Sequence, residues 1–278
     1  MKKFWKHANM RLKIGLIMTA FFMILGFVVY YIPHVNPFAF NTYPKKLLPS
    51  AQHWLGTTTM GQDTFWMLIE AIHNSLLIGL IVATIGTVLG VLVGLIAGFS
   101  GGWVDRTLMV ITDTFVVIPS LPILILMTAL MKGTSTVILL ALVLAMFAWA
   151  WPSRQIRAMA LTIRERDFIS TARFSGESTL QIVTTEILPY ALTWSFSNFM
   201  NATLNAIASE SSLAVLGLSP ANLISLGNMI QWARARNAIF ARQWFWIGSP
   251  IVATVLLFIG LFLLITGYND YLSMKRGQ

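Results

Sequence analysis

Long uncharged apolar runs constrain this chain more than any other feature. Residues 14 to 32 form one such run of 19 residues, and residues 76 to 99 form another. Nineteen residues in a helix span about 30 Å, the thickness of the hydrocarbon core of a bilayer. With 56% hydrophobic and only 10% charged residues, the chain lacks the polar side chains that would cover a soluble globule of 278 residues. The sequence therefore predicts an all-α integral membrane protein.

Four further apolar segments bring the number of predicted membrane-spanning helices to six. Pro119 and Pro122 interrupt the third span and predict a kink or break there. The fourth span is expected to continue past Pro152. The fifth is rich in Ser, Thr and Asn, so it is expected to face protein or a wet cavity. The six predicted spans cover about residues 14 to 32, 76 to 99, 107 to 131, 137 to 159, 190 to 216 and 246 to 268.

Glycine recurs every fourth residue within the second predicted span. This spacing lines one face of the helix with hydrogen atoms in place of side chains, which lets another helix approach closely. We therefore predict that a second helix packs against this face. The glycines are Gly86, Gly90, Gly94 and Gly98.

The basic residues predict the orientation of the chain in the membrane. If both termini are cytoplasmic and Arg154 and Arg157 are counted with the cytoplasmic segment that follows them, 13 of the 19 Lys and Arg residues are cytoplasmic and 6 fall outside. This bias agrees with the positive-inside rule, and it also explains the net charge of +9 without a nucleic-acid partner. We expect a cytoplasmic N-terminus (1 to 13), a first span with an external loop (14 to 70) and a transmembrane domain (71 to 278) in the cell membrane.

Several kinds of chemical site are not expected on this chain. It has no cysteine, which excludes disulfides and thiolate metal sites. Its four histidines have no partner at the spacing of a metal site, and no phosphate-binding G-x-x-x-x-G-K-[ST] motif is present. We therefore expect no enzyme activity, no metal and no cofactor on this chain. If ATP drives its function, another polypeptide binds the ATP.

Residues 164 to 189, which we call the coupling segment, form a polar interruption that the charge count places in the cytoplasm. Phe168, Ile169 and Ala172 lie at helical spacing and predict a short helix. Gly176 permits a turn that a side chain would hinder. An ordinary cytoplasmic loop with a glycine turn is the alternative interpretation.

A second short helix is expected after this turn. Ser178 and Gln181 have the spacing of a capping box, so the helix is predicted to begin there and to run to Leu188. Two short helices at an angle would make a compact protrusion on the cytoplasmic side.

The coupling segment resembles the EAA motif of ABC-importer permeases from bacteria and archaea. In that motif an acidic-Ala-Ala triplet is followed by a glycine at a fixed offset and by an Ile-Leu-Pro ending. Here the triplet is Ser170-Thr171-Ala172, the glycine is Gly176, and the ending is Ile187-Leu188-Pro189. Serine replaces the glutamate of the family, so no contact that needs a carboxylate at position 170 is implied. The resemblance implies that the ATPase is contacted by Asp167, Phe168, Ser170, Thr171, Ala172, Arg173, Gly176 and Glu177.

Further motifs, in the same order along the chain, resemble the dipeptide/oligopeptide group of these permeases. Gln62 stands where that group has arginine. The chain is most similar to the second, shorter permease subunit of such an importer. The motifs are Leu55-Gly56-Thr57, Gly61-Gln62-Asp63, Gly101-Gly102-Trp103-Val104-Asp105, Ile118-Pro119-Ser120, Glu210-Ser211-Ser212-Leu213, Leu216-Gly217-Leu218 and Gly227-Asn228-Met229.

This resemblance implies a type I ABC importer permease fold with a cytoplasmic coupling helix. It also implies a heterodimer with a second permease, two ATP-binding subunits that carry ATP and Mg, and an external substrate-binding protein that docks near residues 36 to 70 and 219 to 245. Peptides, oligosaccharides and nickel are the substrates that the group implies. The alternatives are a secondary transporter driven by an ion gradient and a membrane-embedded enzyme, for which the sequence offers few membrane acids and no catalytic set.

Two acidic residues, Asp113 and Glu210, lie in or at the edge of predicted spans. An unpaired carboxylate is costly there, so each is expected to face protein, a polar cavity or an interface. Structural pairing or capping is the interpretation that we favour. A proton or ion relay is the alternative.

Overall fold

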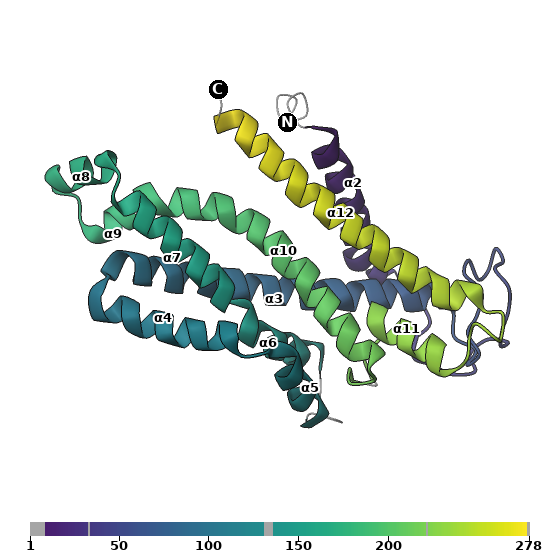
Figure 1. Ribbon diagram of the computed structural model, residues 1–278. Coiled ribbons are helices and arrows are strands. Elements are labelled where there is room, and N and C mark those ends of the chain that lie inside the picture. Colours follow the sequence, from purple (N-terminus) through teal and green to yellow (C-terminus); the bar gives the residue numbers. More distant parts are fainter. Residues whose placement is uncertain (1–8, 33, 131–135, 221, 277–278) are drawn as a thin grey trace. The chain divides into compact units, whose positions relative to one another are not determined.

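The computed structural model describes residues 9 to 32, 34 to 130, 136 to 220 and 222 to 276, and these are mainly helical (Figure 1). Within them there is no strand, only an isolated bridge between Thr57 and Asp63. Most of the predicted cytoplasmic N-terminus and the predicted end of the third span at Met131 lie outside the described residues. In chain order the elements are α2 (Met10–Phe27), the 3₁₀ turn η1 (Val29–Tyr31), α3 (Thr64–Ser100), α4 (Gly102–Val117), α5 (Ser120–Leu130), α6 (Val137–Ala148), α7 (Ala150–Arg164), α8 (Asp167–Phe174), α9 (Thr179–Ile182), the π-helical turn η2 (Val183–Ile187), α10 (Leu188–Val215), α11 (Leu226–Ala235) and α12 (Trp244–Arg276).

Apolar helices of membrane-crossing length make up much of the described chain. Three stretches are long and apolar enough by themselves, namely Met10–Tyr31, Thr64–Ser100 and Trp244–Met274. Two bent pairs, α4 with α5 and α6 with α7, reach the same standard together, which gives up to five spans in the described residues. The predicted fifth span corresponds to α10, which has 28 residues but lies outside this apolar set. Its many Ser, Thr and Asn side chains account for this.

A proline explains the bend in one of the two bent pairs. The pair α4 and α5 is bent by 78° at Ile118 and Pro119, which confirms the predicted break. Ile118 is extended because a residue before proline disfavours the helical conformation. The pair α6 and α7 is bent by 40° at Trp149. Pro152 lies within the first turn of α7, where a missing N–H breaks no helical hydrogen bond.

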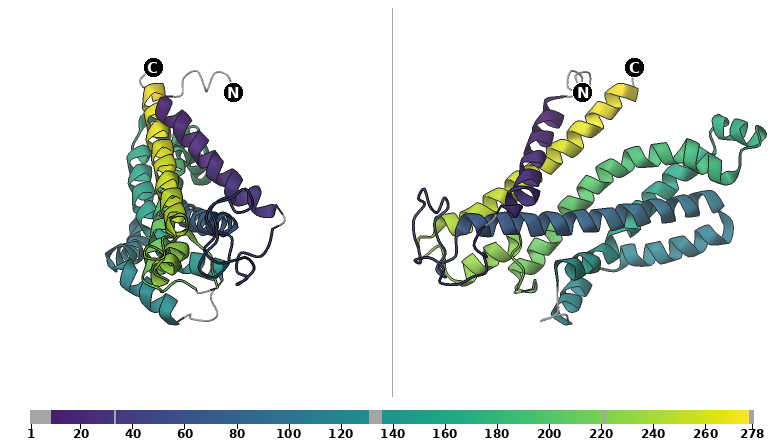
Figure 2. Two further views of the ribbon diagram at one scale, coloured as in Figure 1. Left: turned by 90° about the vertical axis from the view of Figure 1, so that its right-hand side faces the viewer. Right: turned by 180° about the vertical axis from the view of Figure 1, so that it is seen from behind.

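By its internal contacts the chain divides into two compact units, and each is described separately. One unit contains Met1–Gly79, Ile125–Leu140 and Leu204–Gln278. In it α2 runs beside α12 (Figures 1 and 2). A side chain added at Gly15 would overlap the backbone of Leu264, so these two helices touch backbone to backbone.

The same unit holds residues 36 to 70, which we call the external segment because the charge count places them outside. Its backbone is held by side-chain hydrogen bonds. The Thr57 hydroxyl accepts from the Leu47 N–H at 2.9 Å and donates to the Pro44 carbonyl at 2.7 Å. The Gln62 amide donates to the Pro37 carbonyl at 2.7 Å.

Asp63 joins the external segment to the start of α3. One of its carboxylate oxygens lies 2.6 Å from Nδ1 of the buried His53. The other accepts from the backbone N–H groups of Phe65 at 2.9 Å and Trp66 at 3.3 Å, which are among the first N–H groups of α3. The Gly61-Gln62-Asp63 motif therefore ties the segment to a helix that enters the membrane.

The second unit contains Leu80–Leu124 and Ala141–Thr203. The predicted glycine face of α3 lies against the end of α6 at Gly86 and against α7 beyond it, which confirms that a helix packs there. A Cβ added at Gly94 would lie 2.6 Å from the carbonyl oxygen of Ser153, and one at Gly98 would lie 2.7 Å from the Cβ of Ala160. This close approach holds α7 along the second half of α3, and α7 leads directly into the coupling segment.

An ion pair joins α4 to α7 in the same unit. The Arg157 guanidinium donates two hydrogen bonds to the Asp105 carboxylate, the second at 2.7 Å from Nη2 to Oδ2. Bidentate pairs of this kind add geometric specificity to their attraction. Asp105, from the predicted first cytoplasmic turn, thus fixes the start of α4 against α7.

Candidate functional site

The first half of the coupling segment forms α8, as its helical spacing predicts. Ile169 is 1% exposed and Ala172 is also buried, so these two residues face inward. The hydroxyls of Ser170 and Thr171 lie on the outer side and donate to the Asp167 carbonyl at 3.1 Å each. Serine at position 170 therefore satisfies its hydrogen bonding within its own helix.

Gly176 ends α8 with φ at +85°. Its N–H donates to the Arg173 carbonyl at 3.0 Å, and the Glu177 N–H donates to the Ala172 carbonyl at 3.1 Å. These two bonds form a Schellman motif, in which glycine is preferred because a side chain is strained at positive φ. The predicted turn at Gly176 is confirmed.

The predicted capping box at the start of α9 is also confirmed. The Ser178 hydroxyl accepts from the Gln181 N–H at 3.3 Å, and the Gln181 side chain accepts from the Ser178 N–H at 3.1 Å. The predicted end of this helix at Leu188 is wrong, because α9 continues through η2 into α10 without a loop.

Pro189 explains the form of this junction. It lies in the first turn of α10 and has no N–H to donate to the carbonyl of Thr185 four residues earlier. The Leu188 N–H instead bonds the Val183 carbonyl five residues back, which is the π-helical pattern. Proline thus changes the hydrogen-bond pattern here without stopping the helix.

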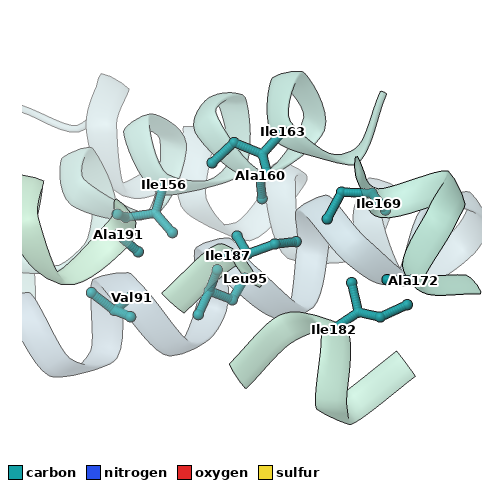
Figure 3. Packing of buried hydrophobic residues seen from close by; sticks show 10 residues of the cluster. All are labelled: Val91, Leu95, Ile156, Ala160, Ile163, Ile169, Ala172, Ile182, Ile187 and Ala191. Atoms are coloured by element: carbon teal, nitrogen blue, oxygen red, sulfur yellow. The ribbon is translucent and has the colours of Figure 1, made fainter. Parts of the chain in front are cut away.

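A buried apolar cluster anchors the coupling segment (Figure 3). Fully burying an isoleucine side chain contributes about 1.5–3 kcal/mol, so several such residues hold α8 and α9 firmly. The coupling segment contributes Ile169, Ala172, Ile182 and Ile187. The helices beneath it contribute Val91, Leu95, Ile156, Ala160, Ile163 and Ala191.

Two arginines add polar contacts at the edge of this cluster. Arg164 lies 3.4 Å from the carbonyl oxygens of both Gly98 and Phe99, which end α3. The Arg173 guanidinium lies 5.7 Å from the centre of the Phe99 ring, within cation–π range. Both arginines therefore connect the coupling segment to the last turn of α3.

Large apolar side chains remain on the outer side of the coupling segment. Phe174 is 92% exposed and Leu180 is 72% exposed, with Phe168 partly exposed beside them. Exposed apolar groups next to a rigid anchor are typical of a surface that another protein covers. Sequence reasoning missed Phe174 and Leu180. The buried spacing of Ile169 and Ala172 was the available signal, because it turns position 174 away from the core.

The structure brings all eight predicted contact residues together on α8 and the turn after it. Six of them are exposed and Glu177 is half-buried. Ala172 differs, because it packs into the apolar cluster and is not available to a partner. The exposed six are Asp167, Phe168, Ser170, Thr171, Arg173 and Gly176.

Both acids predicted to be buried in or near spans have partners. Glu210 is fully buried and accepts from the Ser225 hydroxyl at 2.6 Å and from the Ser219 hydroxyl at 3.3 Å. Asp113 lies 3.5 Å from Arg154 and is exposed. Glu210 is thus hydrogen-bonded through Oε1, as structural pairing requires, whereas its buried Oε2 has no partner in the described residues. No group of three or more potential metal-binding side chains occurs in the described part of the chain.

Comparison with known proteins identifies relatives over most of the chain. Residues 90–277 match the family described as the binding-protein-dependent transport system inner membrane component. The oligopeptide transport system permease protein OppC of Mycobacterium tuberculosis (strain ATCC 25618 / H37Rv) is 32% identical over 92% of this chain and 90% of its own length. The nickel transport system permease protein NikC of Escherichia coli (strain K12) is 26% identical over 92% of each chain.

A solved structure supports the fold. A chain of the MetNI methionine ABC transporter, in inward-facing conformations, superposes with a TM-score of 0.55 at 19% sequence identity. The match covers 77% of this chain and 99% of that chain. At this identity the likeness concerns the fold alone.

Proposed function

Because this chain belongs to the family of inner membrane components of binding-protein-dependent transport systems, we propose that it passes oligopeptides across the cytoplasmic membrane as one permease of an ATP-driven importer. Its similarity to oligopeptide permeases over 92% of the chain supports peptides as the substrate class. Nickel and oligosaccharides are the other substrates to be tested in parallel, nickel because of the similarity to NikC.

The exposed apolar surface of the coupling segment carries the proposed ATPase contact. Phe174 and Leu180 project from short helices whose inner side is anchored on α3 and α7. A partner that binds these side chains can therefore move the helices beneath them as one rigid lever. The partner would be an ATP-binding subunit, which carries ATP and Mg, and two such subunits would serve the permease pair.

The remaining partners follow from the same assembly. A second, related permease would complete the transport path as a heterodimer. An external substrate-binding protein would dock on the external segment and on residues 219 to 245. This arrangement requires both termini to be cytoplasmic, which the distribution of basic residues supports.

Phe174→Ala tests the ATPase contact. In the assembled transporter, we expect this change to weaken retention of the ATP-binding subunits about tenfold or more, since a buried aromatic anchor contributes about 2 kcal/mol at an interface. Retention is measured in detergent, without the binding protein, and uptake is measured in proteoliposomes. Phe240→Ala is the matched control, because Phe240 is 87% exposed but lies in the other candidate docking region. Equal retention by the two variants would contradict the proposed contact.

Gly176→Glu tests the turn beside this surface. No atom lies within 4 Å of a Cβ placed at Gly176, so the added side chain would project into open space. The positive φ is strained for glutamate, and the new charge lies next to the apolar contact. We expect loss of ATP-dependent uptake or loss of the complex. Normal assembly and normal uptake would refute the rigid-lever proposal.

A further inference from the structure

The ion pair between Asp113 and Arg154 is unusually exposed for a pair within membrane-spanning helices. The two side chains lie 3.5 Å apart and are 54% and 50% exposed. Asp113 belongs to α4 and Arg154 to α7, and each helix is half of a bent pair that passes as a membrane span. The other ion pair between these helices, Asp105 with Arg157, is much less exposed.

The pair lies well inside the two bent spans, although the charge count takes Arg154 as cytoplasmic. Asp113 is about three turns, or 16 Å, from the start of α4, and Arg154 is a similar distance from the end of α7. These two helix ends lie on the side of the coupling segment. Half of a hydrocarbon core is about 15 Å, so a bilayer that begins at these two helix ends has the ion pair near its middle.

Both helix breaks lie beside the pair. Asp113 precedes the end of α4 at Val117 by one turn, and Arg154 follows the bend at Trp149 by about one turn. The Phe115 ring lies 5.2 Å from the Trp149 ring and so holds the two breaks together. Interrupted backbone at membrane depth is tolerated where protein buries it or where it lines a water-filled cavity.

Lipid cannot cover this surface. Two half-exposed charges at mid-membrane would be costly against hydrocarbon, and charged residues at this depth face protein or water. The described part of this chain does not bury them, so either the transport path or a partner subunit adjoins them. The open geometry of the pair favours the path. Arg154 contacts Asp113 through one nitrogen at 3.5 Å, whereas Arg157 donates two short bonds to Asp105.

We propose that Asp113 and Arg154 line the transport path and recognise the charged ends of a passing zwitterionic peptide. The planar guanidinium of Arg154 has further N–H donors, which suit a carboxylate. The Asp113 carboxylate suits an ammonium group. Each residue can exchange its partner in the pair for a charge on the peptide, so binding leaves no charge unpaired. Such a contact is weak enough to release the peptide, as transport requires. The peptide substrate rests on the proposed function, whereas the lining of the path does not.

Cysteine accessibility tests the lining. The chain contains no cysteine, so a single introduced one is unique on this subunit. Asp113→Cys and Arg154→Cys are treated, in the assembled transporter, with a small charged membrane-impermeant thiol reagent. The control is Phe262→Cys, an exposed position on the apolar helix α12. We expect both test cysteines to react about tenfold faster than the control. Reaction as slow as that of the control at both positions would overturn the proposal.

Peptide chemistry tests the recognition. Arg154→Gln is expected to raise the KM for uptake of a free peptide about tenfold and to leave a C-terminally amidated peptide unaffected. The swapped pair, Asp113→Arg with Arg154→Asp, separates recognition from a structural role. A purely structural pair would be rescued by the swap for both peptides, which would overturn the proposal. Uptake of no peptide by the unchanged transporter would refute the proposed function, while the cysteine test would still decide the lining.

Discussion

The external segment and the coupling segment both connect long helices, yet different interactions stabilise their conformations. In the external segment, side chains such as Thr57, Gln62 and Asp63 bond the backbone directly. In the coupling segment, the side chains that hold it in place are mainly apolar and pack on the helices below, with Arg164 and Arg173 at the edge. In the external segment, individual side chains hydrogen-bond individual backbone groups. An apolar anchor fixes one side of a helix and leaves the other side for a partner.

The glycines of the two segments show the same difference. Gly56 and Gly176 both have positive φ, at +72° and +85°. A side chain at Gly56 would overlap the carbonyl oxygen of Leu47, whereas one at Gly176 would meet nothing within 4 Å. Gly56 in the external segment is thus required for two reasons: its φ is positive, and no side chain would fit there. In the coupling segment, glycine is required by conformation alone.

Gly56→Ala should have the largest effect. We expect it to destabilise the detergent-solubilised chain by about 4 kcal/mol or more, because both conformational strain and backbone overlap must be relieved. Gly176→Ala is the matched control and should cost about 1–2 kcal/mol, the strain of a left-handed residue alone. Thermal unfolding measures both. Equal losses would mean that the two turns are equally confined.

Ile182→Ala should have the next largest effect. Ile182 is 1% exposed in the apolar cluster, and removing such a side chain costs about 2–5 kcal/mol. Leu180→Ala, two residues earlier and largely exposed, should change stability by less than about 0.5 kcal/mol. The same thermal measurement applies. If both variants unfolded alike, the apolar anchor would not be the force that holds the coupling segment.

Ser170→Glu should have the smallest effect. The side chain is exposed, and its only described bond is to the carbonyl of its own helix. We expect a stability change below about 0.5 kcal/mol. ATPase retention should stay within about twofold of the unchanged transporter, since the proposed contact depends on Phe174 and Leu180. A large gain in retention would instead mean that the carboxylate of the family motif carries the contact.

Local features of this structure could be predicted from the sequence. The capping box at Ser178, the turn at Gly176 and the break at Pro119 depend on rules that involve a few neighbouring residues. The glycine face of α3 could also be predicted, because glycines four residues apart lie on one side of a helix. In each case the residue type alone limits the backbone.

Other features depend on contacts that no local pattern encodes. The exposure of Phe174 follows from which side of α8 packs on α3 and α7. Glu210 accepts from Ser219 and Ser225, which lie 9 and 15 residues along the chain, and no spacing rule connects them. Pro189 predicts a helix end, but a proline in a first turn is equally compatible with a helix that continues.

The π-helical turn at Val183–Ile187 has a mechanical consequence. Since α9, η2 and α10 follow one another without a loop, no flexible linker separates the exposed Leu180 from α10. The chain contains one extra residue relative to an α-helix at η2. If η2 returned to α-helical hydrogen bonding, with the extra residue moved out of the turn, α9 would rotate by about 100° around the axis of α10, the rotation per residue of a helix.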